Sequence, residues 1–154
     1  MSNLLVQNIK HTNNTTAQTI DTSGRTTISI MNNDSTNRSD GGAVTQNLVQ
    51  GLAKHWVMFD GSGTPAIQDS LNSASLVDNG TGDYATNLTN NMSNSNYGYS
   101  LATGGNDIDL WGMASPSRST SQIENVTKYH QNGSNAVNVA DRTSMSSTIH
   151  GALA

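Results

Sequence analysis

Two acidic, glycine-rich segments are the first places in this sequence where side chains could do chemistry. Asp60-Gly61-Ser62-Gly63 and Asp78-Asn79-Gly80-Thr81-Gly82-Asp83 combine carboxylate and carbonyl oxygens, the ligands that calcium prefers. An EF-hand loop also needs a glutamate at its twelfth position, and neither segment supplies one. Asp, Asn and Gly are equally the residues that tight turns require. We therefore expect both segments to be turns, with no bound metal.

The four histidines give no metal or catalytic pattern. His11, His55, His130 and His150 never occur as His-x-His or His-x3-His pairs. Three copies of His150 around a three-fold axis could hold an ion, but a surface or packing role is the simpler expectation. No spacing pairs a nucleophile with a general base. We expect a non-enzymatic protein without a cofactor.

Two tryptophans offer a different chemistry, the stacking of an aromatic ring on a sugar. Asn106, Asp107, Asp109 and Trp111 combine an indole with amide and carboxylate groups that bind hydroxyls, so they are the candidate glycan contacts. The chain has only one Phe, so large aromatics are also needed in the core or at a subunit interface. We favour core or interface for Trp56 and leave both interpretations open for Trp111.

The composition indicates which elements must position these residues. The chain has 154 residues, of which 33% are hydrophobic and only 12% charged, with 20 Asn, 20 Ser and 18 Thr. Disordered chains usually carry a higher net charge than the −4 found here. Ser, Asn and Gly disfavour helix interiors because they compete for backbone hydrogen bonds or leave the backbone too free. The composition predicts an ordered, all-β protein.

Several classes of partner are not expected. The chain has no Cys, so it has neither a disulfide framework nor a thiolate site. The sequence has no basic cluster, so binding to nucleic acid is not expected. It also has no apolar run long enough to insert into a membrane. The start, Met1 to Gln7, lacks the features of a signal peptide, so we expect synthesis in a cytoplasm.

Short strand-like segments separated by turn signals follow one another from His55 to His150. Such spacing indicates an antiparallel sandwich or barrel of eight or nine strands, and we expect a jelly-roll-like β-sandwich. The expected strands are His55–Phe59, Ala66–Leu71, Ser75–Val77, Asp83–Leu88, Tyr97–Ala102, Ile108–Met113, Gln122–Tyr129, Val137–Val139 and Thr143–His150.

A short N-terminal β arm precedes the sandwich. Leu4–Ile9 and Thr26–Met31 are strand-like, and Asn32–Gly42 contains no apolar residue and is the expected linker. We therefore divide the chain into residues 1–42, an arm or anchor with a linker, and residues 43–154, the sandwich. The segment Ala43–Lys54 has apolar residues at helical spacing, but Gly51 weakens a helix, so this element is left open.

The strand around Trp56 has large apolar side chains on both faces. Alternation puts Trp56 and Met58 on one face and His55, Val57 and Phe59 on the other. Since both faces of such a strand must be buried, we assign the Phe59 face to the core and the Trp56 face, including Met58, to a subunit interface. A lean core and an arm that cannot fold alone favour a homotrimer.

The ordered motifs in this part of the chain resemble a β-sandwich module of bacteriophage tail-fibre and other virion proteins. That module has a Lys-x-Trp-Val-x-Phe-x-Gly-x-Gly-Thr strand and turn, then an Ile-x-x-Ser strand. A Met-x-x-x-x-Tyr entry to a later strand follows, and the N-terminal arm resembles the family's opening segment more loosely. The matching segments here are Lys54–Thr64, Ile67–Ser70, Val77–Tyr84, Met92–Tyr97 and Ile149–Ala154.

The resemblance implies a structural or adhesion protein of a virion, commonly trimeric and made in the host cytoplasm. The first hypothesis is a surface module of the tail or tail fibre that contacts the host, attached to other virion proteins through the arm. Capsid-exterior decoration, as a head fibre or cement protein, is the alternative. A carbohydrate-binding, lectin-like protein is an alternative of another class, and a host surface glycan is the corresponding partner.

Overall fold

The computed structural model of the chain falls into two compact units, Met1–Val49 and Gln50–Ala154. This division lies a few residues after the boundary expected between 42 and 43. The structure describes residues 8–10, 16–28, 31, 35–38, 45–104, 110–130 and 137–154.

The first unit contains a three-stranded antiparallel sheet in the order β1-β2-β3. Its strands are β1 (Asn8–Lys10), β2 (Thr16–Ile20) and β3 (Thr26–Ile28). The turn between β2 and β3 contains Asp21 and Gly24, residue types that favour tight turns. The Asp21 carboxylate accepts hydrogen bonds from the backbone N–H groups of Ser23 and Arg25, while Gly24 adopts a φ of 77°. The short strand β2 was not expected.

The expected linker and the helix left open both contain extended chain. Strand β4 (Thr36–Arg38) lies inside the expected linker and pairs with β5 (Thr45–Asn47). Helix α1 is confined to Leu48–Gly51, because β5 and β6 take residues on either side of it. Within the described part of the chain, no helix is both long and apolar enough to cross a membrane.

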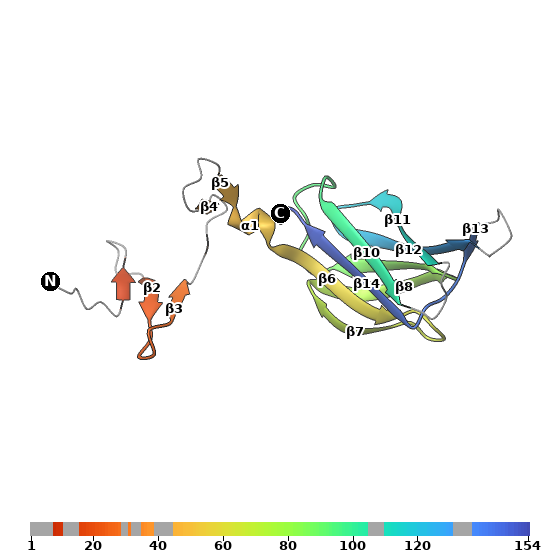
Figure 1. Ribbon diagram of the computed structural model, residues 1–154, viewed down its shortest axis with the longest axis horizontal. Helices are drawn as coiled ribbons and strands as arrows, with labels where there is room; N and C mark the ends of the chain where they lie inside the picture. The colour runs from red at the N-terminus through yellow and green to blue at the C-terminus, as the bar shows by residue number, and fades with distance from the viewer. Residues whose placement is uncertain are drawn as a thin grey trace. The chain divides into compact units, whose positions relative to one another are not determined.

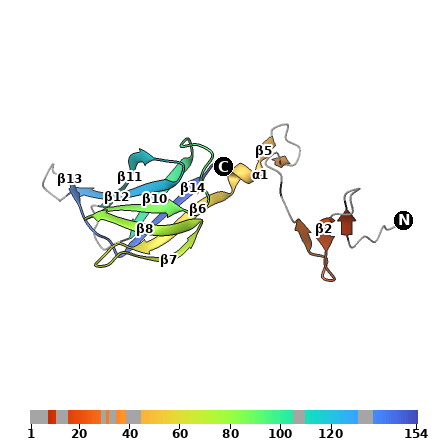
Figure 2. The ribbon, with the colours of Figure 1, turned by 180° about the vertical axis from the view of Figure 1, so that it is seen from behind.

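The second unit is a sandwich of two antiparallel sheets (Figures 1 and 2). The β6 sheet has the order β10-β14-β6-β7. The β9 sheet has the order β11-β12-β9-β8, with β13 also paired to β12. The strands are β6 (Ala53–Asp60), β7 (Ala66–Leu71), β8 (Ser73–Gly80), β9 (Asp83–Leu88), β10 (Gly98–Gly104), β11 (Leu110–Arg118), β12 (Gln122–His130), β13 (Val137–Val139) and β14 (Ser144–His150).

These nine strands correspond one to one with the nine expected segments, and the predicted antiparallel β-sandwich is confirmed. Hairpins join β6 to β7 and β8 to β9 where turn residues were expected, and a third hairpin joins β11 to β12. Each sheet also depends on pairs distant in sequence, β14 with β6 and β12 with β9. The pairing of β14 with β6 brings the last strand of the sandwich beside the Trp56 strand.

Two apolar clusters fill the space between the sheets. One cluster contains Val57, Phe59, Tyr84 and Met145. The other contains Leu88, Met92, Tyr97, Ile123 and Ile149. The Phe59 and Tyr84 rings meet edge to face, with centroids 5.3 Å apart. The core is lean, as the composition predicted, so each of these large side chains matters for stability.

Candidate functional site

The strand β6 presents two different faces, as its alternation predicted. His55, Val57 and Phe59 are at most 1% exposed and point into the sandwich. Met58 is 42% exposed and Trp56 is half-buried, and both lie on the outer side of the sheet. Assignment of the Phe59 face to the core is confirmed.

Strand register places Trp56 and Met58 in two adjacent cross-strand rows. Trp56 pairs with Thr148 and Leu71, and Met58 pairs with Ser146 and Asp69. Because directly opposed residues share a face, each row crosses the whole sheet. We call this surface the Trp56 face; its residues are Ser100, Thr148, Trp56 and Leu71 in one row and Ala102, Ser146, Met58 and Asp69 in the other.

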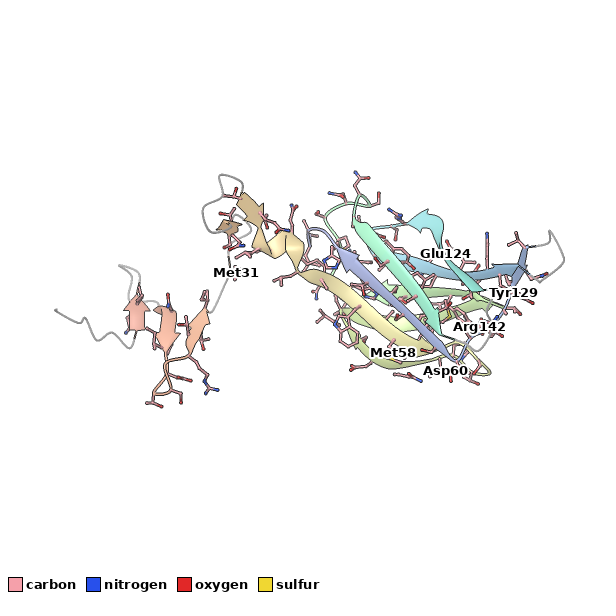
Figure 3. All side chains as sticks on the ribbon, viewed as in Figure 1. Met31, Met58, Asp60, Glu124, Tyr129 and Arg142 are labelled. Carbon is pink, nitrogen blue, oxygen red and sulfur yellow. The ribbon has the colours of Figure 1, made fainter. Side chains whose placement is uncertain are left out.

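The side chains of the Trp56 face are unevenly distributed. Strands β10 and β14 contribute only small ones, from Ser, Ala and Thr, whereas β6 and β7 contribute Trp56, Met58 and Leu71. Leu71 is 46% exposed, so the apolar group is open to solvent at its β7 edge. Figure 3 shows Met58 on β6, at the lower side of the sandwich in that view. An open apolar group at the middle of a sheet face is typical of a surface that binds another molecule.

The outer face of the β9 sheet has a different chemistry. Asn87 donates through Nδ2 to Ser75 Oγ at 2.9 Å, and Gln122 donates through Nε2 to Asn87 Oδ1 at 2.9 Å. These three residues come from β8, β9 and β12, so the bonds form a polar ladder across three strands. These three side chains satisfy one another's polar groups, whereas Val77, Ala85 and Val126 lie further along the same face.

Comparison with known proteins adds no relative. No family model, curated protein or solved structure matches the chain.

The predicted glycan contacts fall mostly outside the part of the chain that can be described. Asn106, Asp107 and Asp109 lie outside the described residues. Trp111 belongs to β11, where its backbone is opposite Lys128 of β12. Its side chain is likewise outside the description. The glycan site therefore stays a prediction, as does the contact of Trp56 and Met58 with another subunit.

A polar corner closes the end of the sandwich where the acidic turns lie. The Tyr84 hydroxyl donates to the Gly61 carbonyl at 2.7 Å and to the Asp141 carboxylate, which also accepts the Gly82 N–H at 2.7 Å. Burial is the main reason that the pKa of Tyr84 is raised. Hydrogen bonds from the Tyr84 hydroxyl and the Gly82 N–H lower the pKa of Asp141. A Cβ at Gly61 would lie 2.7 Å from the Tyr84 ring, so glycine is required there.

The two acidic segments at this end were predicted to be turns. The structure confirms this for Asp60 and Asp78, whose carboxylates bond within their own turns. Asp60 accepts hydrogen bonds from the Ser62 N–H and hydroxyl, and Asp78 accepts one from the Gly80 N–H. At the same end, the Arg142 guanidinium lies 5.5 Å from the centre of the Tyr129 ring (Figure 3). Among the described residues, no group of three or more acidic or histidine side chains is placed to hold a metal.

A second polar group lies inside the sandwich. The Tyr99 hydroxyl donates to Asn125 Oδ1 at 2.6 Å, and Asn125 donates through Nδ2 to Thr86 Oγ1 at 3.2 Å. His55 is fully buried with Nδ1 3.3 Å from Ser73 Oγ, and burial lowers its pKa. His150 is exposed, with Nδ1 3.1 Å from the Gly51 carbonyl oxygen. These contacts give His55 a packing role and His150 a surface role in the subunit.

Proposed function

We propose that this chain is a non-catalytic structural or adhesion protein of a bacteriophage particle, acting as a homotrimeric surface module of the tail or its fibres. The observation that carries the proposal is the Trp56 face, where exposed Met58 and Leu71 flank Trp56 and the other residues are small except for Asp69. A sheet face in contact with water usually carries polar side chains, as the β9 sheet does at Ser75, Asn87 and Gln122.

The size of the face supports a contact that works together with others. The whole outer side of the β6 sheet, with four strands about 4.8 Å apart and about seven residues long, covers roughly 450 Å², and the Trp56 face is only part of it. A standard stable interface takes about 800 Å² from each partner. The Trp56 face alone is therefore too small for a tight two-chain complex, and the N-terminal arm is the natural second contact, with neighbouring copies and with other virion proteins.

The motif series supports the virion setting. The Lys-x-Trp-Val-x-Phe-x-Gly-x-Gly-Thr pattern supplies Trp56, Phe59 and Gly61, and each has a distinct structural task. Trp56 lies on the outer face, Phe59 fills the core, and Gly61 admits the Tyr84 ring. The pattern that carries the resemblance thus coincides with residues that the fold requires.

The test combines native mass with particle association. The full chain should be a trimer by light scattering at micromolar concentration. Trp56→Ala should shift the mass toward monomer, while Val77→Ala on the outer side of the β9 sheet should leave it unchanged. A monomeric wild-type chain would refute the trimer.

Labelled protein should also co-sediment with purified particles and appear on the tail when the particles are imaged. Label confined to the capsid exterior would replace the tail assignment with decoration of the head. If Trp56→Ala keeps the trimer but loses binding to host cells or purified glycans, the face binds sugar instead.

A further inference from the structure

His55 lies inside the second unit, on the inner side of β6. Register places it opposite Ile149 of β14, which in turn lies opposite Tyr99 of β10, so the three residues form one inner row of the β6 sheet. The side chain of His55 is 0% exposed. The imidazole is therefore out of contact with water.

The imidazole helps to hold the corner at which the chain passes from the β6 sheet to the β9 sheet. Its Nδ1 lies 3.3 Å from the hydroxyl oxygen of Ser73, the first residue of β8. Asn72, between β7 and β8, adopts a φ of 59° and donates through Nδ2 to the carbonyls of Lys54 and Asn90, both at 3.0 Å. Side-chain contacts thus fix the position where β7 ends and β8 begins.

The imidazole suits this position only when it is neutral. A neutral ring has one N–H donor and one acceptor nitrogen, whereas a protonated ring has two donors. In the described part of the chain, Nε2 of His55 has no hydrogen-bond partner, so the protonated ring would leave a buried donor unpaired. Burial of an unpaired charge costs far more than burial of a neutral polar group.

Among the described residues, no acidic side chain of the surrounding strands is placed to stabilise a positively charged ring. Asp69 of β7 lies on the outer Trp56 face. Glu124 of β12 lies between two buried residues and so points to the outer side of the β9 sheet. The Asp residues of the two acidic turns are at the opposite ends of β6 and β8, five or more residues along the strands and roughly 16 Å away.

The other titratable side chains described on these strands and beside them are phenols and bases. The phenols are Tyr84, Tyr97 and Tyr99, and burial raises their pKa values, so they stay neutral in acid. The bases are Lys54, Arg118, Lys128 and His150. A positive charge on any of these bases would repel a protonated His55. Protonation of His55 therefore places an uncompensated charge inside the subunit.

We propose that His55 is an acid-sensitive contact of the sandwich: its neutral ring holds the corner between β7 and β8, and its protonation releases that corner and destabilises the folded subunit. This behaviour belongs to the single subunit and depends on no oligomeric state. It gives the buried histidine a regulatory role in addition to its packing.

The direction of the pH dependence follows from the two states of the chain. In the unfolded chain a histidine takes up its proton near pH 6.5. In the folded chain burial lowers the pKa of His55, and the backbone of Asn72 and Leu71 opposes this only in part. The unfolded state therefore binds more protons as the pH falls below about 6.5. The contribution of His55 to stability is fully present above about pH 7 and decreases in acid.

Urea denaturation of the full chain at pH 7.5 and pH 5.0 tests this behaviour. If the folded ring stays neutral, His55 should lower the ratio of folded to unfolded chain by up to about 30-fold between these two pH values. His55→Gln has a polar side chain that stays uncharged, so its ratio should decrease less than that of the wild type, by up to the same factor.

The matched control is His150→Gln, which removes an exposed imidazole from the neighbouring strand β14 and should keep the pH dependence of the wild type. Equal pH dependence of the wild type and His55→Gln overturns the inference. A reduced pH dependence in His150→Gln, with none in His55→Gln, assigns the effect to the surface and also overturns it.

Nitrogen NMR of the wild-type imidazoles keeps the test decisive if His55→Gln does not fold. The His55 ring of the folded chain should become protonated only below pH 6.5, or only as the chain unfolds. A His55 ring that becomes protonated at pH 6.5 or above, while the chain stays folded, overturns the inference.

Discussion

The two outer faces of the sandwich share the same strand geometry but differ in how their side chains are satisfied. On the β9 sheet, Ser75, Asn87 and Gln122 hydrogen-bond to one another across three strands. On the β6 sheet, the corresponding central positions carry Trp56 and Met58. Apolar surface in water costs about 25 cal/mol per Å², and no neighbouring polar group can offset that cost. This difference between Trp56 and Met58 on one sheet and the polar ladder on the other is the reason for proposing that a partner contacts the β6 sheet.

Phe59→Ala has the largest expected effect on subunit stability. It tests whether the core of the sandwich is stable independently of both outer faces. Phe59 is fully buried against Tyr84, so its loss should destabilise the subunit by about 3 to 5 kcal/mol. Chemical denaturation of the isolated subunit measures this. Trp56→Ala should instead act mainly on assembly, and equal loss of subunit stability in both variants would remove the distinction between the faces.

A charge placed on each outer face compares the two surfaces directly. Met58→Glu puts a carboxylate at the centre of the Trp56 face, where a subunit contact would bury it, so the trimer should be lost at micromolar concentration. Gln122→Glu adds the same charge to the β9 sheet, where Gln122 is exposed, and should leave the native mass unchanged. Light scattering of both variants measures their native masses. Identical masses would show that a charge has the same effect on assembly at both faces.

Tyr84→Phe keeps the ring against Phe59 but removes the hydroxyl that joins Gly61 to Asp141. Leaving the Gly61 carbonyl without its donor should cost about 1 to 2 kcal/mol in thermal or chemical unfolding. The trimer should survive, because the polar corner lies at the end of the sandwich and not on the Trp56 face. Loss of assembly in this variant would show that the end turns also join subunits.

The same variant should change the acid dependence of stability. In the wild type, the pKa of Asp141 is below its unfolded value because the Tyr84 hydroxyl donates to its carboxylate. This contribution is therefore present at neutral pH and is lost as the pH falls below about 4. Tyr84→Phe should flatten that part of the stability profile. A profile unchanged by the substitution would contradict the role given to this hydrogen bond.

The smallest expected effect belongs to the polar ladder. Asn87→Ala removes both of its side-chain bonds, but Ser75 and Gln122 are exposed and water can replace the lost partner. The change in unfolding free energy should stay near 0.5 kcal/mol, with no change in native mass. A larger effect, or loss of the trimer, would mean that the β9 face also meets another chain.

Local patterns were enough to predict the strands of the sandwich and the two faces of β6. Alternation in His55 to Phe59 separated inner from outer side chains correctly, because strand geometry alone sets that period. The turn at Asp60 was equally predictable, since its carboxylate bonds within two residues. Where a feature depends on neighbours in the chain, the sequence pattern was sufficient.

Features that depend on distant pairing were missed. Tyr84 and Asp141 are 57 residues apart, and the residues of the polar ladder come from three strands. The strands β2 and β4 were also missed, because their mostly polar residues pair through the backbone and show no apolar alternation. Only the register of the folded sheets brings such groups together.

The contact between His150 and Gly51 has a practical consequence. His150 Nδ1 lies 3.1 Å from the Gly51 carbonyl oxygen, so the chain enters and leaves the sandwich at adjacent points. A unit with neighbouring ends can be inserted into a surface loop of another scaffold without stretching either junction. It could also be circularly permuted, with Gly51 joined to Ala154 by a short peptide and new ends opened at the exposed Gly63 turn. We therefore expect that the sandwich can be transferred as a unit to another protein and presented on its surface.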